Sequence, residues 1–301
     1  MSDAPAWVDL LDPDEATLRA ALPDGVHAAS VERILLTGIE ARPRLEARGN
    51  YVFGVLMYPV PSDAGIDFLE IDVIASPGTF VTVRSGPPGS SIPGIDTVRD
   101  HSNRVGESPG MCLFHLIDQI AEQFLGIIDV YDERIETLED EISTLAAADV
   151  RRRIADYRHD MLHVRRMLTP TRDAARSVLD DRVELDEAAT LFPRSTELHF
   201  ADAYDKLLRA TDDLDLTRDL LAGVRDYHQA EIANEQNDIV KRLTAIASLL
   251  LLPTFIVGLY GQNFIKSMPE LRWKYGYQWS WTLIIVTTIL QFWYFRRKRW
   301  I

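Results

Sequence analysis

The last quarter of the sequence contains two long stretches without a charged residue. Residues 243–265 form a run of 23 uncharged residues, and residues 275–295 form a second run of 21. A helix needs roughly 20 apolar residues to cross the ~30 Å hydrocarbon core of a bilayer. A buried core helix can imitate one such run, but two runs separated by only nine residues are hard to explain in that way. The pattern predicts a two-helix transmembrane hairpin.

Basic and aromatic residues at the ends of these runs indicate the orientation of the hairpin. Lys241 and Arg242 precede the first run, and the basic residues 296–299 follow the second. By the positive-inside rule, both ends of the hairpin lie in the cytoplasm. No apolar stretch opens the sequence, so we expect no signal peptide. The expectation is a multi-pass plasma-membrane protein with two spans, both termini in the cytoplasm, and contact with membrane lipids.

The part before the hairpin has two regions with different sequence patterns. Residues 1–107 are predicted to form an α/β domain, because their segments rich in β-branched and aromatic residues are bounded by Pro, Gly and Asp. From 108 to 195 apolar residues recur at helical spacing, which predicts a cytoplasmic helical hairpin. The expected strands lie at 7–10, 51–60, 68–75 and 80–84, and the expected helices at 14–22, 28–38, 111–148 and 150–179.

One very long helix follows. From 196 to 260 only Pro253 interrupts the helical pattern, and such a helix would span roughly 100 Å at ~1.5 Å per residue. We interpret it as a stalk helix that continues into the first transmembrane span. An outer loop (261–274), then the second span with a basic tail (275–301), would complete the chain. The predicted fold is an α+β cytoplasmic domain followed by a stalk helix and a transmembrane hairpin.

One face of the long helix mixes small, polar and aliphatic residues at a spacing close to 3.5. Such a repeat keeps one face directed at a common axis. Small and polar residues inside a membrane face other helices or a water-filled path, and two spans per chain are too few to enclose a path. The sequence therefore predicts a homo-oligomer whose first span lines the axis. The positions are Asn237, Val240, Leu243, Ala247, Leu251, Thr254, Gly258 and Gly261.

A second, acidic stripe recurs every seven residues higher on the same helix, at Asp205, Asp212, Asp219 and Asp226. A seven-residue repeat could keep this acidic face directed at the common axis of an oligomer. A solvated helix face explains the stripe equally well, and both interpretations stay open.

Charge and composition remove several other functions. The net charge of −14 argues against nucleic-acid binding, and the single cysteine, Cys112, excludes a disulfide framework. The acidity is concentrated before residue 240, because residues 240–301 hold nine Lys and Arg and one Glu. His159 and His163 are four residues apart, but no Glu lies between them, and we interpret them as surface residues of a helix. No nucleophile motif or carboxylate pair indicates an enzyme.

The segment around the first span resembles a known family. It contains Pro253-Thr254-Phe255, Gly258, Tyr260-Gly261-Gln262-Asn263-Phe264 and Met268-Pro269-Glu270-Leu271. This pattern resembles the CorA family of magnesium and cobalt transport proteins, in which a short outer loop begins with Gly-Met-Asn. The resemblance implies a homopentameric funnel with a central channel for divalent metal cations. Transport, of Mg²⁺ first and of Co²⁺ as well, would need no cofactor and would be driven by the membrane potential.

The resemblance also implies roles for individual residues. Gly261, Gln262 and Asn263 would form the selectivity loop, with Asn263 as the metal-selecting residue. Its neutral amide suits Mg²⁺, which keeps several of its waters. Asn237 and Thr254 match polar rings deeper in the pore. Leu243 and Leu251, with Val240 beside them, match apolar constrictions that gate by dewetting.

Two departures from the family pattern keep other functions open. Gln262 replaces Met, which favours a transporter of the same fold for Zn²⁺ or another transition metal. Lys266 stands in the outer loop where an acidic residue is usual. A ring of lysines would repel cations, which favours a non-conducting, membrane-anchored sensor or scaffold.

A third departure concerns regulation. The resemblance implies a regulatory cation site between neighbouring cytoplasmic domains, with one acid from the stalk and one from the short-helix region. Asp202 matches the stalk acid, but Arg33 stands at its partner position. Arginine has no lone pair for a cation. Our hypothesis is that Arg33 and Asp202 pair directly across the subunit interface, which would weaken or abolish inhibition by cytoplasmic Mg²⁺. The alternative is that the two residues never meet.

Overall fold

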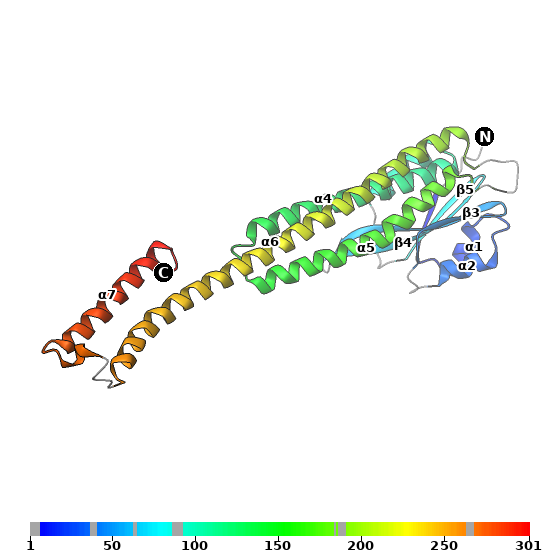
Figure 1. Ribbon diagram of the computed structural model, residues 1–301. Helices are drawn as coiled ribbons and strands as arrows, with labels where there is room; N and C mark the ends of the chain where they lie inside the picture. Colours follow the sequence, from blue (N-terminus) through cyan, green and yellow to red (C-terminus); the bar gives the residue numbers. More distant parts are fainter. Residues whose placement is uncertain are drawn as a thin grey trace. The chain divides into compact units, whose positions relative to one another are not determined.

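The computed structural model describes residues 7–36, 41–62, 65–85, 93–183, 185, 191–262 and 268–301 (Figure 1). The chain divides into two compact units, residues 1–225 and 226–301. The boundary falls inside helix α6 (Arg194–Tyr260), so this one helix contributes residues to both units.

The first unit contains a five-stranded sheet in the spatial order β1-β5-β4-β3-β2. Strand β1 runs parallel to β5, and every other neighbouring pair is antiparallel. The two longest strands, β3 and β4, form a hairpin whose register runs from Val52 opposite Ala75 to Ser62 opposite Gly65. The strands are β1 (Trp7–Leu11), β2 (Arg44–Arg48), β3 (Tyr51–Ser62), β4 (Gly65–Ser76) and β5 (Thr79–Arg84).

Helices lie against both faces of this sheet. On one face, Tyr51 of β3 shares a 2.8 Å hydrogen bond with the hydroxyl of Ser30 in α2 (Ala28–Leu35). On the other face, the Tyr58 hydroxyl donates to Gln123 of α4 (Pro109–Glu141) at 3.3 Å. Residues 51 and 58 are an odd number apart, so their side chains leave the strand on opposite sides. The short helix α1 (Glu15–Ala21) accompanies α2.

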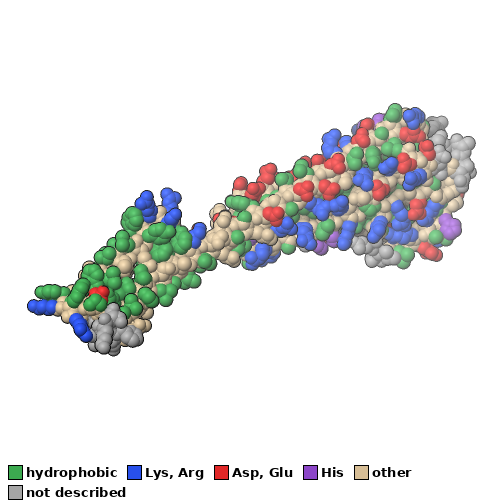
Figure 2. Space-filling model, viewed as in Figure 1, with side chains coloured by type: hydrophobic (Ala, Val, Ile, Leu, Met, Phe, Trp, Pro, Cys, Tyr) green, Lys and Arg blue, Asp and Glu red, His purple; other side chains and the backbone are tan. Residues whose placement is uncertain are grey.

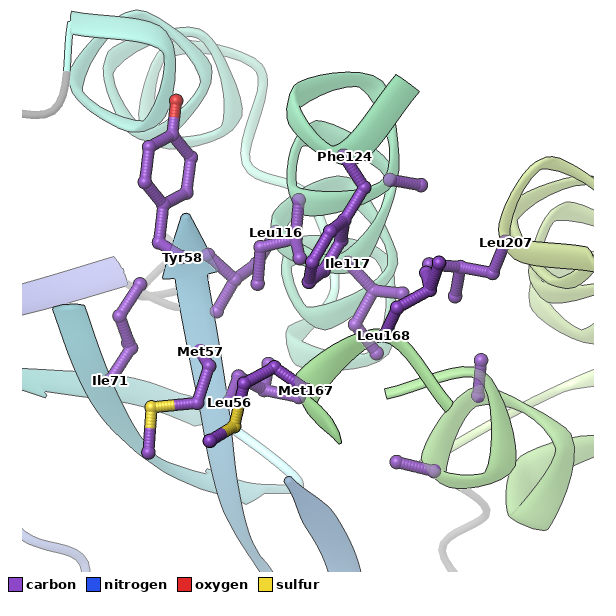
Figure 3. Packing of buried hydrophobic residues seen from close by; sticks show 14 of the residues in the cluster. Leu56, Met57, Tyr58, Ile71, Leu116, Ile117, Phe124, Met167, Leu168 and Leu207 are labelled. Carbon is purple, nitrogen blue, oxygen red and sulfur yellow. The ribbon is translucent and has the colours of Figure 1, made fainter. Parts of the chain in front are cut away.

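The main core lies between the sheet and the long helices. Figure 3 shows Leu116 and Ile117 of α4 reaching in two directions, one toward β3 and the other toward Leu168 and Leu207. Leu168 belongs to α5 (Ala147–Leu179) and Leu207 to α6, and the solvent-exposed fraction of both is 0%. Each buried leucine side chain contributes about 1.5–3 kcal/mol. The core therefore joins the sheet and three helices into one unit.

Ion pairs fix α6 beside its neighbours. Lys206 Nζ lies 2.8 Å from a carboxylate oxygen of Asp118 and 2.6 Å from one of Glu122, both on α4. Arg165 of α5 lies 3.1 Å from Asp215 of α6. These contacts explain why α6 packs beside both α4 and α5 in the first unit.

Most of the secondary structure predicted from the sequence is confirmed, with three corrections. The four predicted strands are present, and the long helix predicted over 196–260 is α6. The prediction missed strand β2 and helix α3 (Pro93–Val105). The helix predicted to end near residue 148 ends at Glu141, and the next begins at Ala147. The break therefore lies several residues earlier than the sequence indicated.

The second unit contains the rest of α6, a short 3₁₀ helix η1 (Pro269–Arg272) and α7 (Gly276–Arg297). In the described part of the chain, α4 and α6 are long and apolar enough to cross a membrane. The apolar window of α4 is 56% buried, as expected of a core helix, whereas that of α6 is only 11% buried. Helix α7 does not meet the same hydropathy criterion, because Trp, Tyr, Thr and Gln dilute its aliphatic residues. The second span stays a prediction.

Candidate functional site

In the second unit, one face of α6 is directed at α7. Ala245 and Ile256 on this face are 0% and 6% exposed, and Ser248 and Leu252 between them are half-buried. A 3.5 Å hydrogen bond from Gln291 Nε2 of α7 to the Ser248 carbonyl oxygen joins the two helices. Residues three or four apart share a helix face, so these positions form one continuous contact face.

The stripe predicted to line an axis lies elsewhere on α6. All eight of its positions, from Asn237 to Gly261, are exposed in the single chain. Leu243 and Leu251, the two predicted constrictions, are 65% and 67% exposed. Such exposure of large aliphatic side chains at regular spacing is typical of a surface that another molecule covers.

Helix geometry places this stripe opposite α7. Each residue advances about 100° around an α-helix, so a step of two residues is about 200°. Leu243 and Ala247 lie two positions on either side of Ala245, and Thr254 and Gly258 lie two positions on either side of Ile256. Most of the stripe is therefore on the face of α6 that points away from α7, whereas Gly261, at its outer end, lines a pocket with Tyr277 and Trp281 of α7. A second copy of α6 can reach that face without displacing α7.

One polar side chain of the stripe, Thr254, makes its hydrogen bond within α6 itself. Thr254 donates its hydroxyl proton to the carbonyl oxygen of Leu250 at 2.7 Å. This hydrogen bond satisfies the donor within the helix and leaves the hydroxyl oxygen with a lone pair. Thr254 can therefore accept a hydrogen bond from a water molecule of a hydrated cation.

The predicted selectivity loop begins in the last turn of α6. The Gly261 N–H donates to the Val257 carbonyl at 2.9 Å, and the Gln262 N–H donates to the Leu259 carbonyl at 3.3 Å. Gly261 is not among the described glycines with a left-handed φ. A Cβ at Gly261 would still lie only 3.2 Å from the Val257 oxygen, so close packing favours glycine.

The remaining residues of the loop lie outside the described part of the chain. They include Asn263, the predicted metal-selecting residue, and Lys266, which motivated the non-conducting alternative. Gln262 is described and is exposed.

Comparison with known proteins assigns the family. The model of the CorA-like Mg²⁺ transporter protein family matches residues 2–297. The chain belongs to this family. The family is one of transporters rather than enzymes.

Relatives of the chain resemble it over nearly its whole length. It is 26% identical over 306 residues to the cobalt/magnesium transport protein CorA of Thermotoga maritima, covering all of this chain and 84% of the relative. It is 24% identical over 323 residues to the magnesium transport protein CorA of Haemophilus ducreyi, covering 93% of that protein.

Solved structures confirm the fold. The complete structure of the CorA magnesium transporter from Methanocaldococcus jannaschii superposes with a TM-score of 0.78 at 20% identity, over 98% of this chain and 91% of that one. The ZntB cytoplasmic domain from Vibrio parahaemolyticus superposes with a TM-score of 0.56 at 19% identity, over 76% of this chain and 89% of that one. The CorA-family fold, an α+β domain followed by long helices, is therefore established for this chain.

The sequence analysis missed Gln291, which lies in the C-terminal half of α7 in this CorA-family chain. Its amide nitrogen bonds to Ser248, but its Oε1 is buried without a hydrogen-bond partner. A polar residue inside an apolar run is the signal that would have identified it.

Arg33 has a partner that the sequence did not indicate. Its Nη2 lies 2.7 Å from Oε1 of Glu70 on β4, and the Arg33 side chain is only 16% exposed. Asp202 is exposed on α6. Within one chain Arg33 is thus paired with Glu70 rather than with Asp202, and the pairing of Arg33 with Asp202 across a subunit interface stays a prediction.

The acidic stripe gives no metal site within one chain. Asp205, Asp212 and Asp219 are exposed on α6 of the first unit, and Asp226 is exposed in the second. No group of three or more His, Cys, Asp or Glu residues suited to a metal ion occurs in the described part of the chain. The rings of His159 and His163 lie 4.7 Å apart on α5, with His159 exposed.

Proposed function

We propose that this protein transports divalent metal cations across the plasma membrane, with Mg²⁺ as the first candidate and Co²⁺ as a further one. The observation that carries the proposal is the position of the α6 stripe, opposite the face that contacts α7. A chain with that arrangement presents its small and polar residues to other copies of itself. We infer a homopentamer, as the family resemblance implies, with two spans per chain and both termini in the cytoplasm.

In the proposed assembly, each stripe position becomes a ring around the axis. Rings of Asn237 and Thr254 would hydrogen-bond the waters of a hydrated cation, while rings of Leu243 and Leu251 would exclude water when the pore is closed. Asn263 would select the ion at the outer mouth, because a neutral amide oxygen can bind the waters of Mg²⁺ without trapping the ion.

The membrane potential is sufficient to drive such transport inward. A charge crossing 100 mV gains about 2.3 kcal/mol, so a divalent cation gains about 4.6 kcal/mol. No nucleotide hydrolysis is needed in this mechanism.

Transport of Zn²⁺ is a second candidate, favoured by Gln262. In the family pattern a Met precedes the Asn of the selectivity loop, and here an exposed glutamine does. A ring of five glutamines changes the polarity of the loop beside Asn263. The likeness to the ZntB cytoplasmic domain concerns the fold and does not decide between the two ions.

Reconstitution in liposomes tests both candidates. Mg²⁺- and Zn²⁺-sensitive dyes trapped inside would report entry while the interior is held negative, and light scattering would verify the assembly of every variant. We expect Mg²⁺ entry that follows the voltage, and Asn263→Ala should change the ion preference without dissociating the oligomer. Zn²⁺ entry without Mg²⁺ entry would favour the second candidate. Intact oligomers that pass neither ion would refute both and support a sensor.

Two adjacent leucines provide a matched pair for the pore assignment. Leu250 and Leu251 are 66% and 67% exposed in the single chain, but only Leu251 belongs to the stripe. Leu251→Ser should let water into a closed constriction and increase flux severalfold. Leu250→Ser should leave flux close to that of the wild type. Equal effects of the two substitutions would show that the stripe does not line the pore.

A further inference from the structure

A pocket in the first unit is lined mainly by arginine. Its volume is about 370 Å³, and it lies between the residues that precede β2 and the middle of α5. Its charged lining is Arg42, Arg165 and Arg166, Thr169 of α5 adds a hydroxyl, and Ala41, Met167 and Pro170 form the apolar lining. Figure 2 shows Lys and Arg side chains gathered over the face of the first unit that α5 forms. The volume is within the range of small-molecule sites, about 300–1,000 Å³.

The positive charge of this pocket is only partly balanced by carboxylates of the described residues. Arg165 lies 3.1 Å from Asp215 of α6, a carboxylate that it shares with Arg218. Arg42 and Arg166, both exposed, have no ion-pair partner among the described residues. Each guanidinium has five N–H donors in a rigid fork and no acceptor. Two unpaired guanidinium groups thus line one pocket that contributes no free carboxylate.

This set of groups suits a phosphate-bearing anion. Guanidinium groups bind phosphate oxygens in bidentate geometry, with charge-assisted hydrogen bonds about twice as strong as neutral ones. The hydroxyl of Thr169 adds a further possible donor at the rim. A polyphosphate has enough charge and oxygen atoms to engage two arginines at once, and the volume of the pocket accommodates it.

We propose that the pocket formed by Arg42, Arg166 and Thr169 binds a soluble polyphosphate, such as a nucleoside triphosphate or tripolyphosphate, in its metal-free form. Bound Mg²⁺ neutralises part of the charge of a polyphosphate and occupies its oxygens. A pocket that offers only cationic donors therefore prefers the anion without its metal. The binding does not depend on the proposed transport, so either can fail while the other stands.

The phosphate group of an acidic lipid has the same chemistry. A soluble anion is favoured because the arginines surround a concave pocket with buried walls, Ala41 and Met167, that can enclose several phosphate groups. A flat basic surface would suit a membrane better.

Calorimetric titration of the full-length protein in a neutral detergent tests the proposal, with tripolyphosphate and ATP as probes. We expect binding that Arg42→Gln and Arg166→Gln each weaken at least tenfold. Arg158→Gln is the matched control, because Arg158 is an exposed arginine of α5 outside the pocket, and it should leave the affinity unchanged. Adding one equivalent of Mg²⁺ per tripolyphosphate should weaken binding to the wild type.

Three results would overturn the inference. The first is the absence of binding, or equal binding by wild type and both pocket variants. The second is tighter binding in the presence of Mg²⁺, which would show that the metal complex is the ligand. The third is binding of nanodiscs containing phosphatidylglycerol, lost in the pocket variants, without binding of tripolyphosphate. That pattern would assign the pocket to lipid.

Discussion

Asp72 is a buried acid whose removal should stabilise the first unit at alkaline pH. It lies on β4, is 5% exposed, and its Oδ1 is buried without a hydrogen-bond partner. In the sheet register Asp72 stands opposite Val55, and Val55 stands opposite Arg44. Arg33 of α2 is engaged with Glu70, two residues before Asp72 on the same strand. Asp72 therefore has charged neighbours but makes no ion pair of its own among the described residues.

These surroundings raise the pKa of Asp72 from its usual 3.8 to about 7. Burial is the main cause and the charge of Glu70 adds to it, while Arg33 and Arg44 act in the opposite direction. The folded protein therefore holds this proton over a pH range where the unfolded chain has lost it. Stability should fall as the pH rises from about 4 to about 7 and should stay low above that. At about 1.4 kcal/mol per pKa unit the full penalty is about 4 kcal/mol.

Asp72→Asn removes the titration while keeping the size of the side chain. The buried amide retains a desolvation cost of its own, about 1–3 kcal/mol. We therefore expect a net gain of about 1–3 kcal/mol at pH 8 and little change at pH 5. Hydrogen exchange of β3 and β4 amides in the full-length protein measures this difference. Because variant and wild type are compared at one pH, the intrinsic exchange rate cancels. A gain of about 3 kcal/mol slows exchange through global opening by roughly a hundredfold.

A matched control separates burial from loss of charge. Asp67→Asn changes an exposed acid on the same strand, and it should alter exchange only slightly at either pH. The reasoning is refuted when Asp72→Asn exchanges faster than wild type at pH 8. That outcome would mean that Asp72 is ionised and usefully held by Arg33 and Arg44.

Three further predictions concern the first unit. Gly65→Ala should destabilise it by about 2 kcal/mol or more, seen as a lower Tm, because Gly65 has a φ of +131° and an added Cβ would lie 2.4 Å from Oδ1 of buried Asp160. Asp9→Ala should cost about 3–5 kcal/mol in denaturant unfolding, because it leaves the guanidinium of Arg84, 7% exposed, without its main partner; a loss below ~1 kcal/mol would contradict this. Cys112, 1% exposed and with a pKa raised by burial to about 12, should react with a thiol reagent only after unfolding, and rapid labelling of the folded protein would show otherwise.

The sequence alone was sufficient to predict the strands and helices that have a strong hydrophobic pattern. The β3 and β4 strands are rich in β-branched and aromatic residues, and α6 has no breaker before Pro253, so periodicity identified all three. Strand β2 was missed because its sequence, Arg-Leu-Glu-Ala-Arg, is largely polar. It is an edge strand, paired only with β3, and such strands tolerate charged residues. Helix α3 was missed because few of its residues are apolar.

Contacts between distant residues were beyond what the sequence could indicate. Arg33 and Glu70 are 37 positions apart, and their ion pair depends on how α2 lies across the sheet. The raised pKa of Asp72 depends on strand register, because a shift of one residue would move its side chain to the other face. The arginine pocket likewise combines residue 42 with residues of α5 that lie more than 120 positions later. Periodicity identifies which face of an element is buried, but not which neighbour covers it.

The long helix shows how periodicity and structure combine into a functional argument. From the sequence alone, the stripe from Asn237 to Gly261 could have been the face that packs against the second span, since small residues are typical of such contacts. The structure assigns that contact to Ala245, Ile256 and their neighbours, and Gln291 of α7 bonds to α6 on that side. From Asn237 to Gly258, the stripe then has no partner among the described residues of its own unit. Thr254 lies within the predicted span and gains little from lipid there, because hydrocarbon cannot donate a hydrogen bond to its hydroxyl oxygen. An assembly in which several copies of α6 turn this face toward a shared, hydrated axis supplies that hydrogen bond from water, and this supports a channel.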